Sequence, residues 1–515
     1  MKLASSFDPY DWATITPLFL ALHEAPISQA GFVNWLGQWN ALDIAVYDAW
    51  VELKRRSYAN IADAAAERAY HVFTREMFST YLGWTNTLAA RALAHQPEPP
   101  TPAYRQLWRR WHNQTTLFHP DSLALQAQIS ELESGYRELT RHIEQSPGNA
   151  LSHWMERRTE LNDLMLHLLK LRRALARTSG MSTFLAYRWR ELNRLGYSIE
   201  ECQSFHRVVE QVAVPLVALL HAANILSAAP PAISDPALLS NGAENILTHI
   251  DPTFGTLFHS MRTDYLDLGS RVGKADVNEA WFFPRVGMPY MHVASPNAAT
   301  LLHESGHAMH FYRSFQAQQS LWNFGAPEEF QEFVAIGMDM LGWPYYDQAM
   351  GGFYTATESR AGCQSVLRFY LEGLVEGVME DAFEHWVYGQ APEDVTPADI
   401  DAKWLEVKQR FMPWDTPDAS AEEAMTGWQR GNWSLFRLPL YTITYPIAIV
   451  GVCQLGVQVQ QDRQRAVDNY KAALSLGNTE TLSELFRIAG VTFPFTEHAI
   501  EAAVQFAHEQ YVKRI

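Results

Sequence analysis

The chain is organised around one stretch, Ser295-Pro296-Asn297-Ala298-Ala299-Thr300-Leu301-Leu302-His303-Glu304-Ser305-Gly306-His307-Ala308-Met309-His310. A serine followed by a proline predicts a helix start, with Ser295 as the N-cap and Pro296 at the first helical position. Residues four apart share a face of a helix, so His303 and His307 can offer ring nitrogens to one metal ion. Glu304 lies beside that face, where its carboxylate can accept a proton from water. This is the H-E-x-x-H arrangement of zinc-dependent hydrolases.

The five-residue pattern also arises by chance in a chain with 19 histidines, so it does not establish a metal site by itself. A third ligand has to be identified. The next acidic segment, residues 326–341, predicts a helix with Pro327 near its start. Glu332 is flanked by apolar residues there, so its carboxylate is expected on the buried side, where it requires a partner. We therefore expect Glu332 as the third ligand. Asp339, two turns further on, is expected to orient a ligand histidine, whereas Glu328 and Glu329 fit a solvated first turn.

The segment from His303 to His310, followed by Glu332 and then by an acid seven residues later, resembles the thimet oligopeptidase and oligoendopeptidase F family of zinc metallopeptidases. Gly306 and the additional His310 distinguish this pattern from a bare H-E-x-x-H. The similarity extends upstream through residues 178–187, and covers the chain from about Leu123 onward.

The resemblance implies a mainly α-helical, two-lobed enzyme with one zinc ion at the floor of a deep substrate channel. It implies His303, His307 and Glu332 as metal ligands, Glu304 as the catalytic base, and short peptides as substrates. With Glu332 as third ligand, His310 is expected to be a supporting or structural residue. The family also has a strand ahead of the metal helix, usually preceded by a lysine and glycines. Lys274 matches the lysine, but Asp276 and Val277 stand where glycines are expected.

Residues 281–293 change character, because aromatic, β-branched and turn residues replace the helical pattern. They predict a β-hairpin beside the metal helix. An edge strand at this place could pair with the main chain of a peptide, and Gly287, Met288 and Tyr290 are the candidate substrate-binding residues. A hairpin that only covers the core is the equal alternative.

A second chemical segment runs from Trp433 to Pro446. Tyr441 and Tyr445 are four residues apart and would share a face of a helix, where a phenol could donate a hydrogen bond to the oxyanion formed during peptide hydrolysis. Buried tyrosines with satisfied hydroxyls are the alternative. The segment resembles the tyrosine-rich region of the family, but the histidine usual there is replaced by Ser434 or Leu440, depending on the alignment.

Composition excludes several other classes. The chain has 515 residues, an apolar fraction of 47% and a formal net charge of −17, which disfavours disorder, nucleic acids and anionic membranes. The longest apolar runs are shorter than a membrane span, and no export or lipidation signal is recognised. Cys202, Cys363 and Cys453 are odd in number and far apart, so neither disulfides nor a cysteine metal cluster is predicted. A cytoplasmic protein is expected.

We expect an N-terminal helical lobe over residues 1–96, because Leu and Trp recur there at helical spacing. The proline-rich residues 97–102 open a linker that is expected to reach residue 122. The catalytic helical domain then occupies residues 123–515, with the zinc site at 303–332 and a substrate-closing segment at 429–455.

The sequence thus predicts a zinc-dependent endopeptidase of short oligopeptides. Three alternatives stay open at this stage. A metallocarboxypeptidase resembling carboxypeptidase Taq is disfavoured, because its H-E-S-Q-S-R block is missing around Glu332. An inactive peptide-binding scaffold is disfavoured by the intact Glu304. An iron or manganese enzyme would use the same ligand types, although the helical spacing favours zinc.

Overall fold

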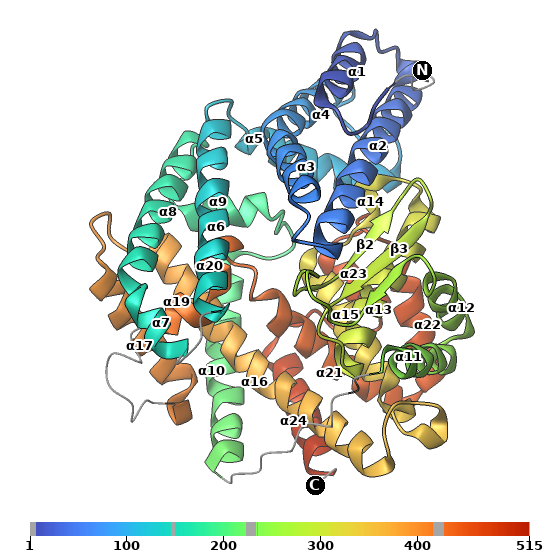
Figure 1. The fold of residues 1–515 in the computed structure, drawn as a ribbon, viewed down its shortest axis with the longest axis vertical. Helices are drawn as coiled ribbons and strands as arrows, with labels where there is room; N and C mark the ends of the chain where they lie inside the picture. The colour runs from blue at the N-terminus through green and yellow to red at the C-terminus, as the bar shows by residue number, and fades with distance from the viewer. Residues whose placement is uncertain (1–6, 146–149, 223–232, 234, 416–426, 514–515) are drawn as a thin grey trace.

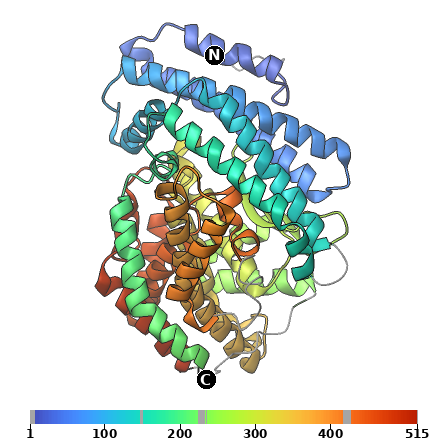
Figure 2. The same cartoon turned by 90° about the vertical axis from the view of Figure 1, so that its left-hand side faces the viewer.

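The computed structural model describes residues 7–145, 150–222, 233, 235–415 and 427–513. Helices dominate these ranges, and one small sheet lies beside the helix that carries His303, so the predicted mainly α-helical fold is confirmed. Figure 1 shows the first helices at the top, the sheet below α2, and the later helices in the lower half. In the perpendicular view of Figure 2 the early helices lie across the top of the later ones.

The N-terminal helices have a hydrophobic core of their own, with Trp35, Leu36, Trp39 and Trp108 among its buried residues. The helices are α1 (Trp12–Glu24), α2 (Phe32–Ala59), α3 (Ala64–Glu76), α4 (Leu82–His95) and α5 (Arg105–Leu117).

The prediction of a linker over residues 97–122 is wrong for most of that segment. Helix α5 occupies its middle, and Leu107, Trp108 and Trp111 belong to the N-terminal core. The proline cluster ends helix α4, but the apolar residues that follow it at helical spacing form another packed helix. The other predicted domain boundaries stay predictions.

The remaining helices pack around one large, continuous core. None of the helices in the described ranges is long and apolar enough to cross a membrane. The helices are α6 (Ser122–Gln145), α7 (Ala150–Glu156), α8 (Arg158–Thr178), α9 (Phe184–Glu191), α10 (Ile199–Ala222), α11 (Pro236–Ile250), α12 (Pro252–Met261), α13 (Ala298–Gln318), α14 (Leu321–Phe324), α15 (Glu328–Gly342), α16 (Ala356–Gly389), α17 (Pro397–Phe411), α19 (Gly427–Gly431), α20 (Trp433–Arg437), α21 (Thr444–Gln461), α22 (Arg463–Leu474), α23 (Leu482–Ile488) and α24 (Glu497–Val512).

The sheet contains β1 (Leu266–Leu268), β2 (Asn278–Phe283) and β3 (Met288–Val293), in the order β1-β3-β2. Strands β2 and β3 form the predicted antiparallel hairpin, and β1 pairs parallel to β3. Both α2 and α13 contact the sheet. The sheet therefore joins the N-terminal lobe to the helix that carries the two histidines.

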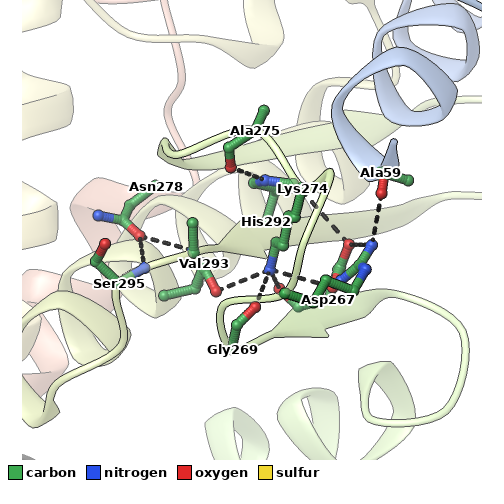
Figure 3. Close-up of polar contacts among 11 residues, drawn as sticks. Ala59, Asp267, Gly269, Lys274, Ala275, Asn278, His292, Val293 and Ser295 are labelled. Carbon is green, nitrogen blue, oxygen red and sulfur yellow. Dashed lines mark hydrogen bonds and ion pairs between the residues drawn. The ribbon is translucent and has the colours of Figure 1, made fainter. Parts of the chain in front are cut away.

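Lys274 fixes the sheet to the loops around it (Figure 3). Its buried ammonium group donates hydrogen bonds to the carbonyl oxygens of Asp267, Gly269 and Val293, each at 2.9 Å, and pairs with the Asp267 carboxylate at 3.1 Å. Asn278 accepts hydrogen bonds from the backbone N–H groups of Ala294 and Ser295 at 3.0 and 3.1 Å. These contacts fix strand β2 relative to the start of helix α13.

Candidate metal and catalytic site

Helix α13 begins two residues later than the sequence predicts. Asn297 is the N-cap, and its side chain accepts a hydrogen bond from Thr300 N–H at 2.9 Å. The Ser295 hydroxyl instead donates to Asp276 at 2.9 Å. Asparagine caps a helix as well as serine does, and Ser295 is already bound to the sheet.

The predicted metal ligands converge in the structure. One ligand atom each from His303, His307 and Glu332 lies within 4.8 Å of the other two. His303 Nε2 lies 3.5 Å from Glu332 Oε2. Both Glu332 Oε2 and His307 Nδ1 are buried and have no hydrogen-bond partner among the described residues. Two imidazoles and one carboxylate with unused lone pairs form a set that fits one divalent cation and leaves a coordination position open.

Burial sets the protonation of these groups. It lowers the pKa of His303 to about 4 and holds that of His307 well below its usual range, so both imidazoles are neutral at pH 7. Burial also raises the pKa of Glu332 to about 8, against the hydrogen bond from Tyr441. A cation among them would offset this cost of burying the carboxylate.

Gly306 allows helices α13 and α15 to approach closely enough for this convergence. A Cβ atom at this position would lie 2.7 Å from both Ala335 Cα and Val334 O of helix α15. The glycine between the two histidines therefore has a packing role.

Glu304 lies beside the three ligands. It is buried, and burial together with the charges of Glu332 and Glu279 raises its pKa well above the usual range. A backbone hydrogen bond from Ala280 of β2 acts in the opposite direction. Both His303 and Glu304 line a cavity of about 610 Å³ between β2, α13, α15 and α16. A carboxyl group with a raised pKa at a cavity wall is suited to accepting and returning a proton.

Tyr441 and Tyr445 both interact with the ligand Glu332. The Tyr441 hydroxyl donates a hydrogen bond of 2.7 Å to Glu332 Oε1, and the two tyrosine rings meet edge to face at 5.7 Å. Burial and the charge of Glu332 raise the pKa of both phenols. The prediction that both tyrosines lie on one helix is wrong, because α21 starts at Thr444 and Tyr441 lies in the turn before it.

The two positions proposed for the missing histidine differ in their surroundings. The Ser434 hydroxyl lies in a buried polar cluster with Glu384, Asn432 and Thr442. Leu440 is a buried apolar residue at a φ of 63°, and its backbone N–H donates to Glu384. Glu384 thus holds the turn that leads into Tyr441.

The two predicted supporting residues have other contacts. Asp339 accepts hydrogen bonds from the Tyr346 hydroxyl and, at 3.2 Å, from Trp343 Nε1, while lining the same cavity as His303. His310 Nδ1 donates to the carbonyl oxygen of Leu474 at 3.2 Å, which directs this ring toward helix α22. Their proposed support of the metal ligands stays a prediction.

The strand expected to pair with substrate is β3 of the sheet. Met288 and Tyr290 lie on β3, which is the middle strand, and Gly287 lies in the turn before it. Strand β1 pairs with β3 only from Met291 to Val293, and Tyr290 is buried against Trp281, with ring centroids 5.4 Å apart. The edge strand next to helix α13 is β2. Substrate binding by residues 287–290 stays a prediction.

Sequence reasoning also missed two buried polar groups. Glu329 is buried and pairs with Arg194 at 3.0 Å, although a solvated position was expected. Cys202, His206, Asp381 and His385 form a second cluster with ligand-like geometry. The signal for it was present as two pairs spaced four residues apart, C-x-x-x-H and D-x-x-x-H.

Comparison with known proteins supports the predicted family. Residues 294–505 match the model of peptidase family M3, and this segment contains the three candidate ligands, Glu304 and both tyrosines. Residues 294–505 are therefore similar to peptidase family M3. This confirms the family resemblance seen in the sequence and indicates a peptidase. No curated protein matches the sequence significantly.

Solved structures share the fold of this protein over the whole chain. PZ peptidase A with an inhibitor is 18% identical, with 99% of each chain covered and a TM-score of 0.88. A protein assigned as oligoendopeptidase F is 21% identical, with 99% of each chain covered and a TM-score of 0.87. Another such protein, from Bacillus anthracis, is 16% identical over 99% of this chain and 98% of its own, with a TM-score of 0.83.

Proposed function

We propose that this protein is a zinc-dependent endopeptidase that hydrolyses internal bonds of short peptides. The observation that carries the proposal is the convergence of His303, His307 and Glu332 within 4.8 Å, beside Glu304, at the wall of a cavity of about 610 Å³. His303, His307 and Glu332 would hold the ion. When bound, zinc supplies Lewis acidity that makes water a nucleophile near neutral pH.

Glu304 performs the proton transfers. Its carboxylate accepts a proton from the attacking water and later returns it to the leaving amine nitrogen. Its raised pKa, caused first by burial, is suited to both steps. Its Oε2 atom has no hydrogen-bond partner among the described residues, so this oxygen is available to water.

The tyrosines divide two further roles between them. Tyr441 uses its hydroxyl to orient Glu332, whereas the pKa of Tyr445 is affected by both Glu332 and Glu304. Tyr445 is therefore placed to donate a hydrogen bond to the oxyanion of the tetrahedral intermediate.

Substrate would bind in the cavity that His303 and Glu304 line. The edge of β2 offers backbone groups for pairing with an extended peptide, which gives affinity without strong side-chain selectivity. Val366 and the exposed Phe369 of α16 supply an apolar wall opposite. We therefore expect apolar side chains of the substrate to be preferred on that side.

The test is digestion of a panel of short peptides with free, blocked and C-terminally amidated ends, mapped by mass spectrometry. Wild type is compared with Glu304→Gln and with a chelator-treated sample that is then reloaded with zinc. Internal cleavage that disappears in both controls and returns with zinc supports the proposal.

Two results would contradict it. Cleavage restricted to free C-termini would make the protein a carboxypeptidase. Binding of peptides without cleavage by a zinc-loaded wild type would make it a peptide-binding scaffold.

A further inference from the structure

A second group of metal-ligating side chains lies between helices α10 and α16. Cys202 and His206 are four residues apart on α10, and Asp381 and His385 are four apart on α16. Each pair therefore presents two ligand types from one helix face. The two helices pack against each other and run side by side in Figure 1. All four residues are buried.

Three of the four distances are close to those of a tetrahedral site, and the fourth is shorter. With zinc bonds of about 2.3 Å to sulfur and about 2.1 Å to nitrogen or oxygen, neighbouring ligand atoms stand roughly 3.3 to 3.6 Å apart. Cys202 Sγ lies 3.5 Å from both His206 Nε2 and Asp381 Oδ2. His385 Nε2 lies 3.2 Å from Asp381 Oδ2, and His206 Nε2 lies 2.8 Å from that oxygen. All four ligand atoms are within 4.8 Å of one another.

A cluster held together by hydrogen bonds alone explains these contacts less well. It accounts for His206 and Asp381, but His385 Nε2 only approaches Asp381 Oδ2, at 3.2 Å, and neither His385 Nδ1 nor Asp381 Oδ1 has a hydrogen-bond partner among the described residues. Buried polar atoms without partners are costly and rare. A cation bound by His385 Nε2 would give this ring a partner.

A divalent cation would be balanced in charge by these ligands. On binding it would displace the proton of the Cys202 thiol, and the thiolate and the Asp381 carboxylate would carry the two negative charges that it neutralises. The guanidinium of Arg194, which interacts electrostatically with Asp381 and Cys202, is paired with Glu329 and bonded to the carbonyl oxygen of Leu440. It is therefore already engaged.

We propose that Cys202, His206, Asp381 and His385 form a second metal site, closed to water and occupied by a structural zinc ion. Four protein ligands including a cysteine are typical of structural zinc, whereas a catalytic zinc keeps an open position. The site links α10 to α16 next to Glu384, which holds the turn before Tyr441. This site is independent of the proposed peptidase activity, since it shares no residue with the first one.

The first test counts metal in the full-length protein. Purified protein is loaded with zinc, desalted and measured by inductively coupled plasma mass spectrometry. We expect two equivalents in wild type, one in the double variant His303→Ala/His307→Ala, one in Cys202→Ser, and none when all three changes are combined. One equivalent in wild type that the double variant loses completely would overturn the proposal.

The second test uses cobalt to identify the ligands. Cobalt(II) bound to a thiolate gives a sulfur-to-metal charge-transfer band in the near ultraviolet, which a site without cysteine does not give. We expect this band in wild type and in the His303→Ala/His307→Ala variant. Cys363→Ser and Cys453→Ser remove the other two buried cysteines and should retain it, while Cys202→Ser should lose it.

The His303→Ala/His307→Ala variant keeps the test decisive even if Cys202→Ser fails to fold, because it leaves all four proposed ligands intact. Its bound cobalt should show the thiolate band, and chelation should lower its unfolding temperature. Absence of the band, or an unfolding temperature that chelation does not change, would overturn the proposal.

Discussion

At the scale of single residues, Tyr441 and Tyr445 lie at the same site but have different partners. The Tyr441 hydroxyl donates a hydrogen bond of 2.7 Å to Glu332. Among the described residues, Tyr445 makes no hydrogen bond to that carboxylate. A hydrogen bond to a metal ligand commonly contributes ten- to a hundredfold to metal affinity, whereas an oxyanion donor acts on the chemical step.

These partners predict different defects in two matched variants. Tyr441→Phe should weaken zinc binding roughly tenfold to a hundredfold, measured by competition with a chelator. Tyr445→Phe should leave zinc binding unchanged and lower kcat by about two to three orders of magnitude in the zinc-saturated enzyme. Equal zinc affinity and a reduced kcat in Tyr441→Phe would reverse the two assignments.

Asp43 gives the protein a pH-dependent stability away from the proposed metal sites. It is buried in α2 and accepts a hydrogen bond of 2.7 Å from Trp322 Nε1. Burial raises the pKa of this carboxyl to about 7. Since the folded state holds the proton more tightly than the unfolded chain does, the free energy of unfolding should fall as pH rises from about 4 to about 7.

Asp43→Asn removes this titration and retains an oxygen that can accept from Trp322. At pH 8 its free energy of unfolding should exceed that of wild type by as much as about 4 kcal/mol, and the two should converge near pH 4. Chemical denaturation across this pH range measures the difference. Asp163→Asn changes the same charge at an exposed position of α8 and should follow the wild-type profile.

At the scale of elements, the approach of α13 to α15 decides the geometry of the first site. Gly306→Ala places a methyl group 2.7 Å from backbone atoms of α15, which cannot move aside as a side chain can. We expect a loss of about 1 to 3 kcal/mol in the free energy of unfolding in the presence of a chelator, and weaker zinc binding because Glu332 moves away from the histidines.

Gly37 provides the matched control for this change. It is an exposed glycine within helix α2, and a Cβ atom there would have no neighbour within 4 Å. Gly37→Ala should raise stability by up to about 1 kcal/mol, because alanine favours the helix. A Gly306→Ala variant that binds zinc as tightly as wild type would show that the spacing of these helices is not limiting.

At the scale of the whole molecule, Arg110 connects the N-terminal lobe to the catalytic half. From α5 it donates hydrogen bonds to the carbonyl oxygens of Asn478 and Trp322, at 2.9 and 2.7 Å. Arg110→Met should lower the free energy of unfolding by roughly 2 to 4 kcal/mol, because it removes two charge-assisted hydrogen bonds and leaves carbonyl groups without partners. Urea denaturation followed by circular dichroism measures this loss.

The neighbouring arginine is the control. Arg109 is exposed, and its bonds to Gln106 and Leu195 are longer, at 3.2 and 3.3 Å. Arg109→Met should change stability by less than about 0.5 kcal/mol. Equal effects of the two substitutions would show that Arg110 does not hold the two halves together.

The sequence by itself determined the features that depend on local periodicity. His303 and His307 share a face because they are four residues apart on one helix, and the hairpin follows from its turn residues and aromatic strands. The position of Glu304 beside that face and the apolar flanks of Glu332 pointed to their roles, and the family pattern supported both. Helix boundaries were less certain, as Asn297 and Ser295 show, because both residues are good caps and only their other partners select between them.

The tertiary structure decided what depends on contacts between distant segments. No local rule states that the C-x-x-x-H of α10 faces the D-x-x-x-H of α16, that Tyr441 binds Glu332, or that β1 pairs with β3 and makes it the middle strand. These relations arise from helix packing across many residues of sequence. Helix packing therefore brings together two pairs of polar residues that had not been predicted to interact, and the four side chains form a second candidate metal site.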